Sequence, residues 1–318
     1  MDRRSRRESQ LRARHRRRRA TALLATLAAL ALIVGAVLGS GSGSGDEAGA
    51  VAEAPPPVEL PRGGTELLPA HLLVGYYGAP QDEELGALGI GSPAEASAEL
   101  ARQAQDYEGN RPVLPFLELI STVANADPGE DGLYRTQQPF GVIDDYLEQA
   151  RADRSLLVLD VQPGRASFPE EVSRLEPYLA EPEVGLALDP EWHVAPSEVP
   201  GDVIGSVDAR VVNRVAERLS QIVAENDLPQ KLLIVHRFTA DMVTDPERLR
   251  TYPGVAIVLN VDGFGDQPSK IVKYEELSAP RKSGFFSGFK LFYNEDVDLL
   301  SPRDVLGLRP DPDLVVYE

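Results

Sequence analysis

Cysteine is absent from this chain of 318 residues, and aromatic residues make up only 6% of it. Without a thiol the protein forms no disulfide and no thiolate metal site, and it lacks the cysteine that carries the lipid of a lipoprotein. Hydrophobic residues nevertheless amount to 42%. That content is ample for one large domain or two small ones.

Two motifs that mark common enzyme classes are also missing. No glycine-rich phosphate-binding turn follows an early strand-like segment, because residues 75–78 have neither the required spacing nor a clear helix start. The sequence also lacks the Gly-x-Ser-x-Gly elbow of hydrolases with a nucleophilic serine. These absences argue against a nucleotide-binding open sheet and against serine-based hydrolysis.

Charge is distributed very unevenly along the chain. Residues 1–19 contain ten arginines against Asp2 and Glu8, whereas the chain after residue 38 contains 22 basic and 48 acidic residues. Between these parts, residues 20–39 form an uncharged apolar run, long enough to cross a bilayer core of about 30 Å as a helix. A basic tail can bind nucleic acid, but basic residues directly before an apolar segment retain that end in the cytoplasm.

We therefore predict a basic cytoplasmic tail over residues 1–19 and a transmembrane signal-anchor helix over residues 20–39. The protein is then a single-pass protein of the cell membrane, with the rest of the chain extracytoplasmic. Small residues at positions 39–41 offer a peptidase site, so secretion after cleavage is the alternative. Residues 40–66 are rich in Gly, Ser and Pro, a composition typical of a linker.

The region 67–318 contains eight short hydrophobic runs that are typical of buried strands. These runs are continuous rather than alternating, as in parallel strands covered on both faces. They occupy residues 72–77, 113–119, 156–161, 184–188, 232–236, 255–261, 289–293 and 314–317. Helix-like segments separate most of them, so the sequence predicts a (β/α)8 TIM-type barrel in preference to a doubly wound open sheet. The last helix is missing, and residues 58–70 are a candidate cover for that face.

Two carboxylates follow the fourth run directly. Pro190 cannot donate to a sheet ladder, so the strand must end there, and Asp189 and Glu191 then emerge at the end of the barrel where such enzymes place their chemistry. A glycosidase needs one protonated and one ionised carboxyl group. We predict Glu191 as the general acid, Asp189 as the neighbour that raises its pKa, and Glu295 or Asp160 as the second carboxylate. Alternatively, Asp-Pro-Glu simply turns the chain, and Glu295 belongs to a solvated acidic loop.

Other polar and aromatic residues at strand ends form a candidate sugar-binding surface, since aromatic faces stack on sugar rings while carboxylates and amides bind hydroxyls. The structural alternative is packing, particularly for the first tyrosine and the two histidines. The candidates are Tyr76, Glu118, Gln162, Trp192, His193, His236, Asp262 and Tyr293.

Four residues near the strand ends are candidate metal ligands. Asp189, Glu191, His193 and His236 carry suitable ligand atoms. Their spacing matches neither a His-x-His strand pair nor a helical His-Glu-x-x-His motif. We therefore expect no metal and no other cofactor, with metal-dependent hydrolysis as a weaker alternative.

Several segments resemble a family of exported actinobacterial proteins that has no characterised activity. The similarity covers about residues 70–318 and is carried by residues 158–165, 184–193, 205–208 and 228–236. It implies an exported or membrane-anchored location and a glycoside-hydrolase-like barrel. The Asp189-x-Glu191 strand end also resembles those of chitinase-like and lysozyme-like barrel glycosidases. Gly185 and Ala187 stand where chitinase-type chains carry further acids, and Pro190 stands where large retaining-glycosidase clans carry Asn.

The sequence thus predicts a membrane-anchored extracytoplasmic barrel that hydrolyses or remodels a cell-envelope or environmental glycan. The alternative is a barrel that binds glycan or cell wall without turnover. The net charge of −26 after residue 38 disfavours polyanionic partners, so no nucleic acid is expected.

Overall fold

The computed structural model describes residues 56–279 and 284–318. The predicted cytoplasmic tail, the predicted membrane anchor and residues 40–55 of the predicted linker lie outside the described residues. Within the described ranges, none of the helices has the length and apolar character needed to cross a membrane. Residues Pro57–Glu318 form one compact unit.

Eight parallel strands close into a ring in this unit. Each strand pairs with its neighbours, and pairing of β1 with both β2 and β11 completes the closure. The strands are β1 (Leu72–Gly78), β2 (Val113–Ala124), β4 (Leu156–Val161), β5 (Val184–Leu188), β7 (Lys231–Arg237), β9 (Val255–Val261), β10 (Phe286–Leu291) and β11 (Leu314–Tyr317). The predicted (β/α)8 barrel is therefore confirmed.

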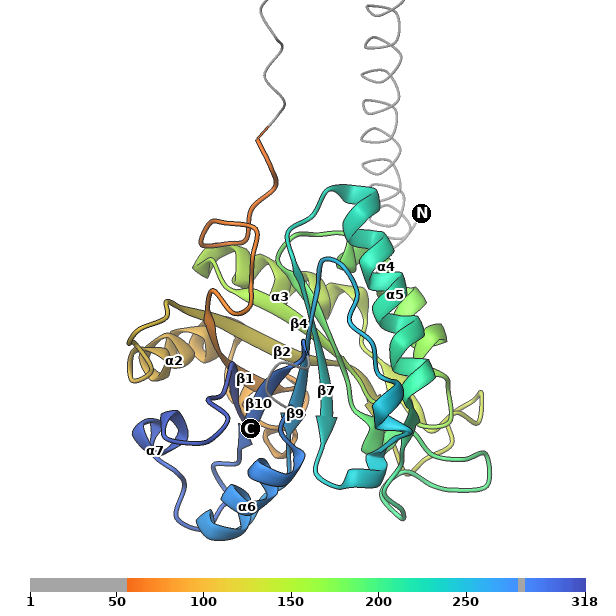
Figure 1. Cartoon of the computed structure of the whole chain (residues 1–318). Coiled ribbons are helices and arrows are strands. Elements are labelled where there is room, and N and C mark those ends of the chain that lie inside the picture. Colours follow the sequence, from red (N-terminus) through yellow and green to blue (C-terminus); the bar gives the residue numbers. More distant parts are fainter. Residues whose placement is uncertain (1–55, 280–283) are drawn as a thin grey trace, which may run out of the picture. The chain divides into compact units, whose positions relative to one another are not determined.

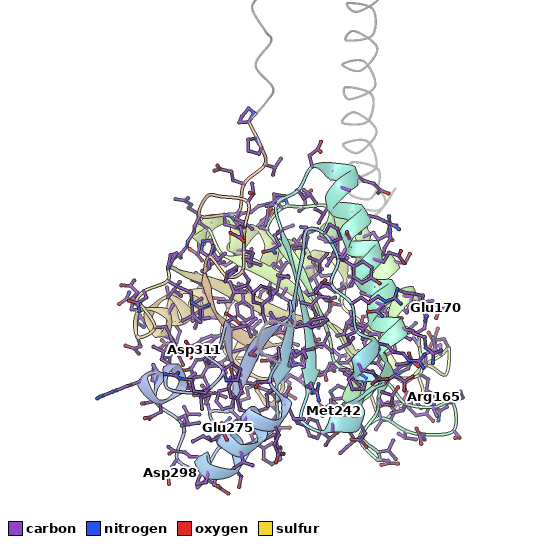
Figure 2. All side chains as sticks on the ribbon, viewed as in Figure 1. Arg165, Glu170, Met242, Glu275, Asp298 and Asp311 are labelled. Carbon is purple, nitrogen blue, oxygen red and sulfur yellow. The ribbon has the colours of Figure 1, made fainter. Side chains whose placement is uncertain are left out.

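Helices lie outside the strands (Figure 1). They are α2 (Pro93–Gln105), α3 (Phe140–Asp153), α4 (Phe168–Leu179), α5 (Ala209–Asn226), α6 (Gln267–Leu277) and α7 (Pro302–Leu306). Exposed charged side chains, such as Glu170 on α4 and Glu275 on α6, lie on their outer faces (Figure 2). Only short elements connect β7 to β9, namely η4 (Ala240–Met242), β8 (Val243–Thr244) and η5 (Pro246–Arg248). No helix follows β11 within the described residues.

Local sequence signals explain where several of these helices begin. Ser92, Ser167 and Ser301 each accept a hydrogen bond from the backbone N–H three residues later, and the acidic residue there reaches back to the serine N–H. This reciprocal capping box satisfies two backbone donors that the first helical turn leaves free. A proline follows in the first turn of each helix, where its missing N–H has no cost.

The strands separate two hydrophobic cores. One lies between strands and helices and includes Val74, Leu157 and Leu159, whereas the other lies inside the ring and includes Leu73 and Val158. Side chains at alternate positions of a strand point to opposite faces. Each strand therefore contributes every second residue to the interior of the barrel.

The amino-terminal end of the barrel interior is closed by the segment before β1. Leu60, Leu67 and Leu68 are buried together with the interior residues of the strands. The side-chain Oε1 of Gln230 accepts from the backbone N–H groups of both Leu67 and Leu68, at 2.9 Å each. This segment thus packs against the interior core instead of covering the outer face beside β11. The compact unit begins at Pro57, before the predicted start at Leu67.

The seventh strand differs from its predicted range. Residues 289–293 were expected, but β10 spans Phe286–Leu291. Lys290 is therefore the last inward-facing residue of the strand, while Tyr293 and Glu295 follow in the loop.

Candidate functional site

Each of the eight strands has a polar residue near or directly after its carboxyl end, or in the middle of the longer strand β2, that continues the inward-facing alternation. On β4, for example, Asp160 follows the interior residues Leu156 and Val158. We call these eight residues the polar ring: Tyr77, Glu118, Asp160, Asp189, His236, Asp262, Lys290 and Glu318. Catalytic groups of barrel enzymes come from this end of the strands, and the side chains of the ring are buried, except for that of Glu318, which is partly exposed.

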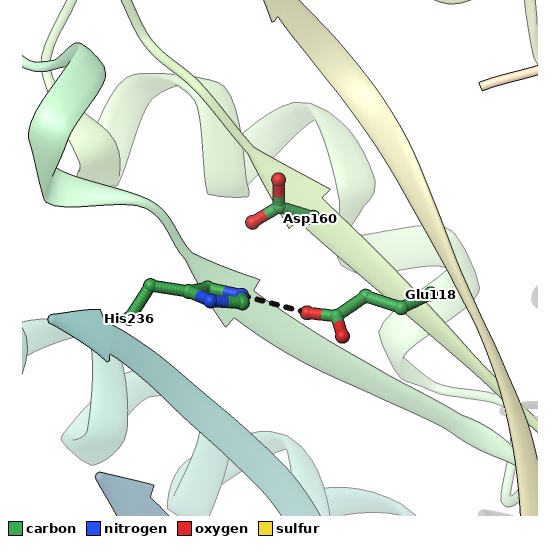
Figure 3. A group of neighbouring side chains, drawn as sticks. All are labelled: Glu118, Asp160 and His236. Atoms are coloured by element: carbon green, nitrogen blue, oxygen red, sulfur yellow. Dashed lines mark hydrogen bonds and ion pairs between the residues drawn. The ribbon is translucent and has the colours of Figure 1, made fainter. Parts of the chain in front are cut away.

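His236 lies at the centre of one half of the polar ring. Its Nε2 is 2.8 Å from Glu118 Oε1, and its Nδ1 is 3.1 Å from Asp262 Oδ2. Asp160 lies beside this pair (Figure 3) and accepts a 3.1 Å hydrogen bond from the Tyr77 hydroxyl. Gln162 Nε2 donates to the same hydroxyl at 3.0 Å. Strands distant in sequence thus converge on one hydrogen-bonded cluster.

Lys290 occupies the other half of the ring. Its Nζ lies 2.6 Å from Glu318 Oε2 and 3.3 Å from Asp262 Oδ2. The backbone N–H of Gly263 donates to Asp262 Oδ1 at 2.6 Å. Asp262 therefore receives donors on both oxygens.

Burial and neighbouring charges shift the ionisation of this network. Although burial opposes it, Glu118 and Asp262 raise the pKa of His236 well above its ordinary value. Lys290 and His236 overcome the effect of burial at Asp262 and hold the pKa of that carboxyl well below its usual range. At Asp160 burial dominates and raises the pKa to about 7, against the opposing charge of His236.

A cavity of about 590 Å³ opens above the polar ring. This volume lies within the range of small-molecule binding sites. Its walls combine acidic, basic and aromatic side chains. The acidic ones are Glu84, Asp189, Glu191, Asp262, Glu295 and Glu318; the basic ones are Lys273 and Lys290; the aromatic ones are Tyr77, Trp192, Phe238, Phe264 and Phe292.

Asp189 and Glu191 reach the cavity from the end of β5. Pro190 begins the 3-10 turn η3 (Pro190–Trp192), which ends the strand and directs Glu191 and Trp192 to the cavity. Burial raises the pKa of Glu191 to about 7, and Asp262 is the negative charge that contributes most to this rise. Burial, followed by the charge of Glu191, raises the pKa of Asp189 well above its ordinary value. The charge of Glu191 thus acts on Asp189, whereas Asp262, rather than the predicted Asp189, is the main charge that raises the pKa of Glu191.

The structure gathers most of the predicted residues at one end of the barrel. Asp189, Glu191 and Glu295, together with Gln162, Trp192 and Asp262, line the cavity. Asp160, Glu118 and His236 do not line it, because their side chains are fully buried in the polar ring beneath.

Three predicted sugar-binding residues lie elsewhere. Tyr76 and Tyr293 pack against Tyr317 on the outer side of the barrel, with ring centroids 6.3 and 5.2 Å from that of Tyr317. Neither lines the cavity, because Tyr76 faces the helices and Tyr293 follows a strand that ends earlier than predicted. His193 packs on Phe168, and its Nδ1 lies 2.6 Å from the carbonyl oxygen of Ser206, which also places it outside the cavity.

Sequence reasoning missed three residues of the polar ring, Tyr77, Lys290 and Glu318. It also missed the wall formed by Phe238, Phe264 and Phe292. Lys290 was detectable, because a lysine within the strand-like segment Phe286–Leu291 is unusual. Phe264 is 64% exposed yet lines the cavity. In the sequence Phe264 closely follows the strand-like run 255–261, and an aromatic residue at a strand end is a second such signal.

One cluster in the described part of the chain has the geometry to hold a metal ion. One ligand atom each from Glu118, Asp160 and His236 lie within 4.8 Å of one another. Of the four candidate ligands in the sequence, Asp189, Glu191, His193 and His236, only His236 belongs to this cluster.

Comparisons with known proteins do not assign this chain to a family. No protein-family model and no curated protein matches the chain. A solved structure that is similar is the Clostridial cellulose synthase subunit Z from Clostridioides difficile, with 10% sequence identity and a TM-score of 0.41. The alignment covers 78% of this chain and 91% of that one. The resemblance to exported actinobacterial proteins stays a prediction.

Proposed function

We propose that this protein is a glycoside-hydrolase-like enzyme that acts on a cell-envelope or environmental glycan. The observation that carries the proposal is the position of Glu191. Its carboxyl group lines the cavity next to Trp192, and its pKa is raised to about 7. A carboxyl group with this pKa is protonated in a large fraction of molecules at neutral pH, as a general acid for glycoside cleavage requires.

Glu295 is the second carboxylate of the proposed mechanism. It lines the same cavity, its side chain is exposed, and it makes no hydrogen bond or ion pair with the other residues that the structure describes. Its oxygens are therefore available to a water molecule or a sugar carbon. Asp262 and Glu318 are less suitable because Lys290 holds both of them. Asp160 is less suitable because it lies beneath the cavity.

The walls of the cavity fit a saccharide. Trp192, Phe238 and Phe264 supply aromatic surface for the C–H faces of sugar rings, and the carboxylates accept hydrogen bonds from hydroxyl groups. Acidic residues outnumber the two lysines in the cavity even when Asp189 and Glu191, whose pKa values are raised, are left out. A neutral or positively charged glycan is therefore favoured over a polyanion. The basic segment 1–19 and the apolar segment 20–39 support attachment to the cell membrane with the barrel outside.

Aryl glycosides with different leaving groups test the role of Glu191. The full chain is assayed on a panel of 4-nitrophenyl and 2,4-dinitrophenyl glycosides. Glu191→Gln should lose about 10²–10⁴-fold of kcat on the poorer leaving group. It should lose far less on 2,4-dinitrophenyl glycosides, which depart without a proton. Glu295→Gln should be impaired on both substrates.

Glu275→Gln is the matched control, since Glu275 lies on the outer face of α6 (Figure 2). Equal losses of Glu191→Gln on both leaving groups would remove the general-acid assignment. Binding of oligosaccharides by the wild type without turnover of any glycan would support the alternative, a non-catalytic glycan-binding barrel.

A further inference from the structure

The polar ring contains buried oxygen atoms that have no hydrogen-bond donor. Glu118 Oε2 and Asp160 Oδ1 are inaccessible to solvent and have no partner among the described residues. Both side chains are 0% exposed. A buried polar atom without a partner costs about 1–3 kcal/mol, and more when it is charged. The chain places two such atoms within one small cluster, so a positively charged partner for them is the simplest physical explanation.

The orientation of His236 fits the same explanation. Its Nδ1 faces Asp262 Oδ2 at 3.1 Å and donates to it, while its Nε2 lies 2.8 Å from Glu118 Oε1, where a bound ion would replace the Nε2 proton. Histidines that bind metals commonly donate their other ring nitrogen to a carboxylate in this way. Asn260 also faces this nitrogen, with its Nδ2 3.2 Å from His236 Nδ1. A 180° rotation of the Asn260 amide would place its unpartnered Oδ1 at that position, where it would accept the Nδ1–H of His236.

We propose that Glu118, Asp160 and His236 bind a divalent metal ion inside the barrel. Two carboxylates and one imidazole form a mixed oxygen and nitrogen set, which suits Mn²⁺ or Zn²⁺ better than it suits Mg²⁺. Metal–ligand distances of about 2.1 Å place adjacent ligand atoms about 3.0–3.4 Å apart. Since the three ligand atoms already lie within 4.8 Å of one another, binding requires them to move together by at most about 1.4–1.8 Å.

The ion would lie beneath the substrate cavity rather than on its wall, because none of the three ligands lines that cavity. It would link the middle of β2 to the carboxyl ends of β4 and β7 (Figure 3). Its role is to hold these three strands in place. The inference does not depend on the proposed glycan chemistry, and binding measurements test it without any substrate.

The first measurement is the metal content and thermal stability of the full chain, purified in detergent without an affinity tag. After EDTA treatment and dialysis, Mn²⁺, Zn²⁺ or Ca²⁺ is added alone. We expect about one Mn²⁺ or Zn²⁺ per chain and a rise in Tm of roughly 5 °C at a hundredfold excess over Kd. No bound metal above one-tenth per chain, with no change in Tm, would overturn the proposal. Preference for Ca²⁺ would overturn the assigned class of metal.

The second measurement locates the ion. Glu118→Gln, Asp160→Asn and His236→Gln should each weaken Mn²⁺ binding at least tenfold, whereas His193→Gln, which alters a histidine outside the cluster, should not. If the cluster variants do not fold, pulsed electron paramagnetic resonance of Mn²⁺ in the wild type and in His193→Gln decides the question. One imidazole nitrogen bound to Mn²⁺ in both proteins is expected. Absence of that nitrogen, or folded cluster variants that bind like the wild type, would exclude this site.

Discussion

The ammonium nitrogen of Lys290 lies 3.6 Å from the centre of the Tyr77 ring, inside the carboxyl end of the barrel. Lys290 is only 3% exposed, yet Asp262 and Glu318 raise its pKa well above the ordinary value despite burial. The lysine is therefore a permanent buried cation. It compensates the carboxylates of the polar ring and has no free lone pair to act as a nucleophile.

Lys290→Met should destabilise the fold strongly. Removing one partner of a buried ion pair leaves the other charge uncompensated, at a cost of about 3–5 kcal/mol. Urea unfolding followed by circular dichroism measures the change. Lys273→Met is the control, because Lys273 also lines the cavity but is partly exposed, so the loss should stay below about 1 kcal/mol. Similar losses for the two variants would contradict a central role for Lys290.

The raised pKa of Glu191 predicts the pH profile of the proposed activity. A general acid works only while it is protonated, so kcat/KM should fall as pH rises above about 7, the pKa of Glu191. The decline should approach tenfold per pH unit. Rates on 4-nitrophenyl glycosides between pH 5 and 9 measure it.

In Glu191→Gln the residual activity should lack this alkaline limb, because glutamine does not titrate. Persistence of the limb in the variant would assign it to another group. Glu295→Gln should keep the limb while lowering the rate at every pH.

The sequence predicted the barrel because its signals are local. Seven of the eight hydrophobic runs overlap the observed strands closely, since a strand covered on both faces needs an unbroken apolar segment. An unbroken apolar segment, however, does not indicate which of its residues face inward. Tyr76 and Tyr77 are adjacent in β1, and only Tyr77 enters the polar ring. Pattern alone could not choose between them.

The contacts between residues of the polar ring could not be predicted for a different reason. Lys290 and Tyr77 are separated by more than 200 positions and meet only because the barrel closes. Because β10 ends at Leu291 and not at residue 293, Lys290 is the last inward-facing residue of this strand. The end of β10 is determined by its hydrogen-bonded pairing with β9 and β11. The register of this pairing cannot be read from the sequence of β10 alone.

A second buried lysine provides a test of stability against pH. Lys231 begins β7, is 1% exposed, and donates to the carbonyl oxygens of Val184, at 2.8 Å, and Glu181. Burial lowers its pKa to about 7 from 10.5. Between these values the unfolded chain binds more protons than the folded one, so this residue makes stability rise with pH.

Lys231 should raise the free energy of unfolding by up to about 1.4 kcal/mol per pH unit. Between pH 7 and 9 the total increase should be roughly 2 kcal/mol. Urea unfolding at pH 7, 8 and 9 measures it as the difference in slope between the wild type and Lys231→Met. The variant should lose this increase. An unchanged slope would mean that Lys231 keeps its proton throughout the range.

Two glycines, one inside the barrel and one on an outer helix, give a matched test of packing in the barrel interior. A Cβ on Gly75 would lie 2.3 Å from the Phe116 ring, whose side chain fills the barrel interior beside β1. Gly75→Ala should destabilise the fold by about 1–3 kcal/mol, because the fully buried phenyl ring cannot move without displacing its neighbours. Gly141 lies in α3 with nothing within 4 Å of such a Cβ. Gly141→Ala should therefore stabilise by up to about 1 kcal/mol through helix propensity alone. Urea unfolding of both variants checks the opposite signs, and a neutral Gly75→Ala would show that the interior is packed more loosely than these contacts require.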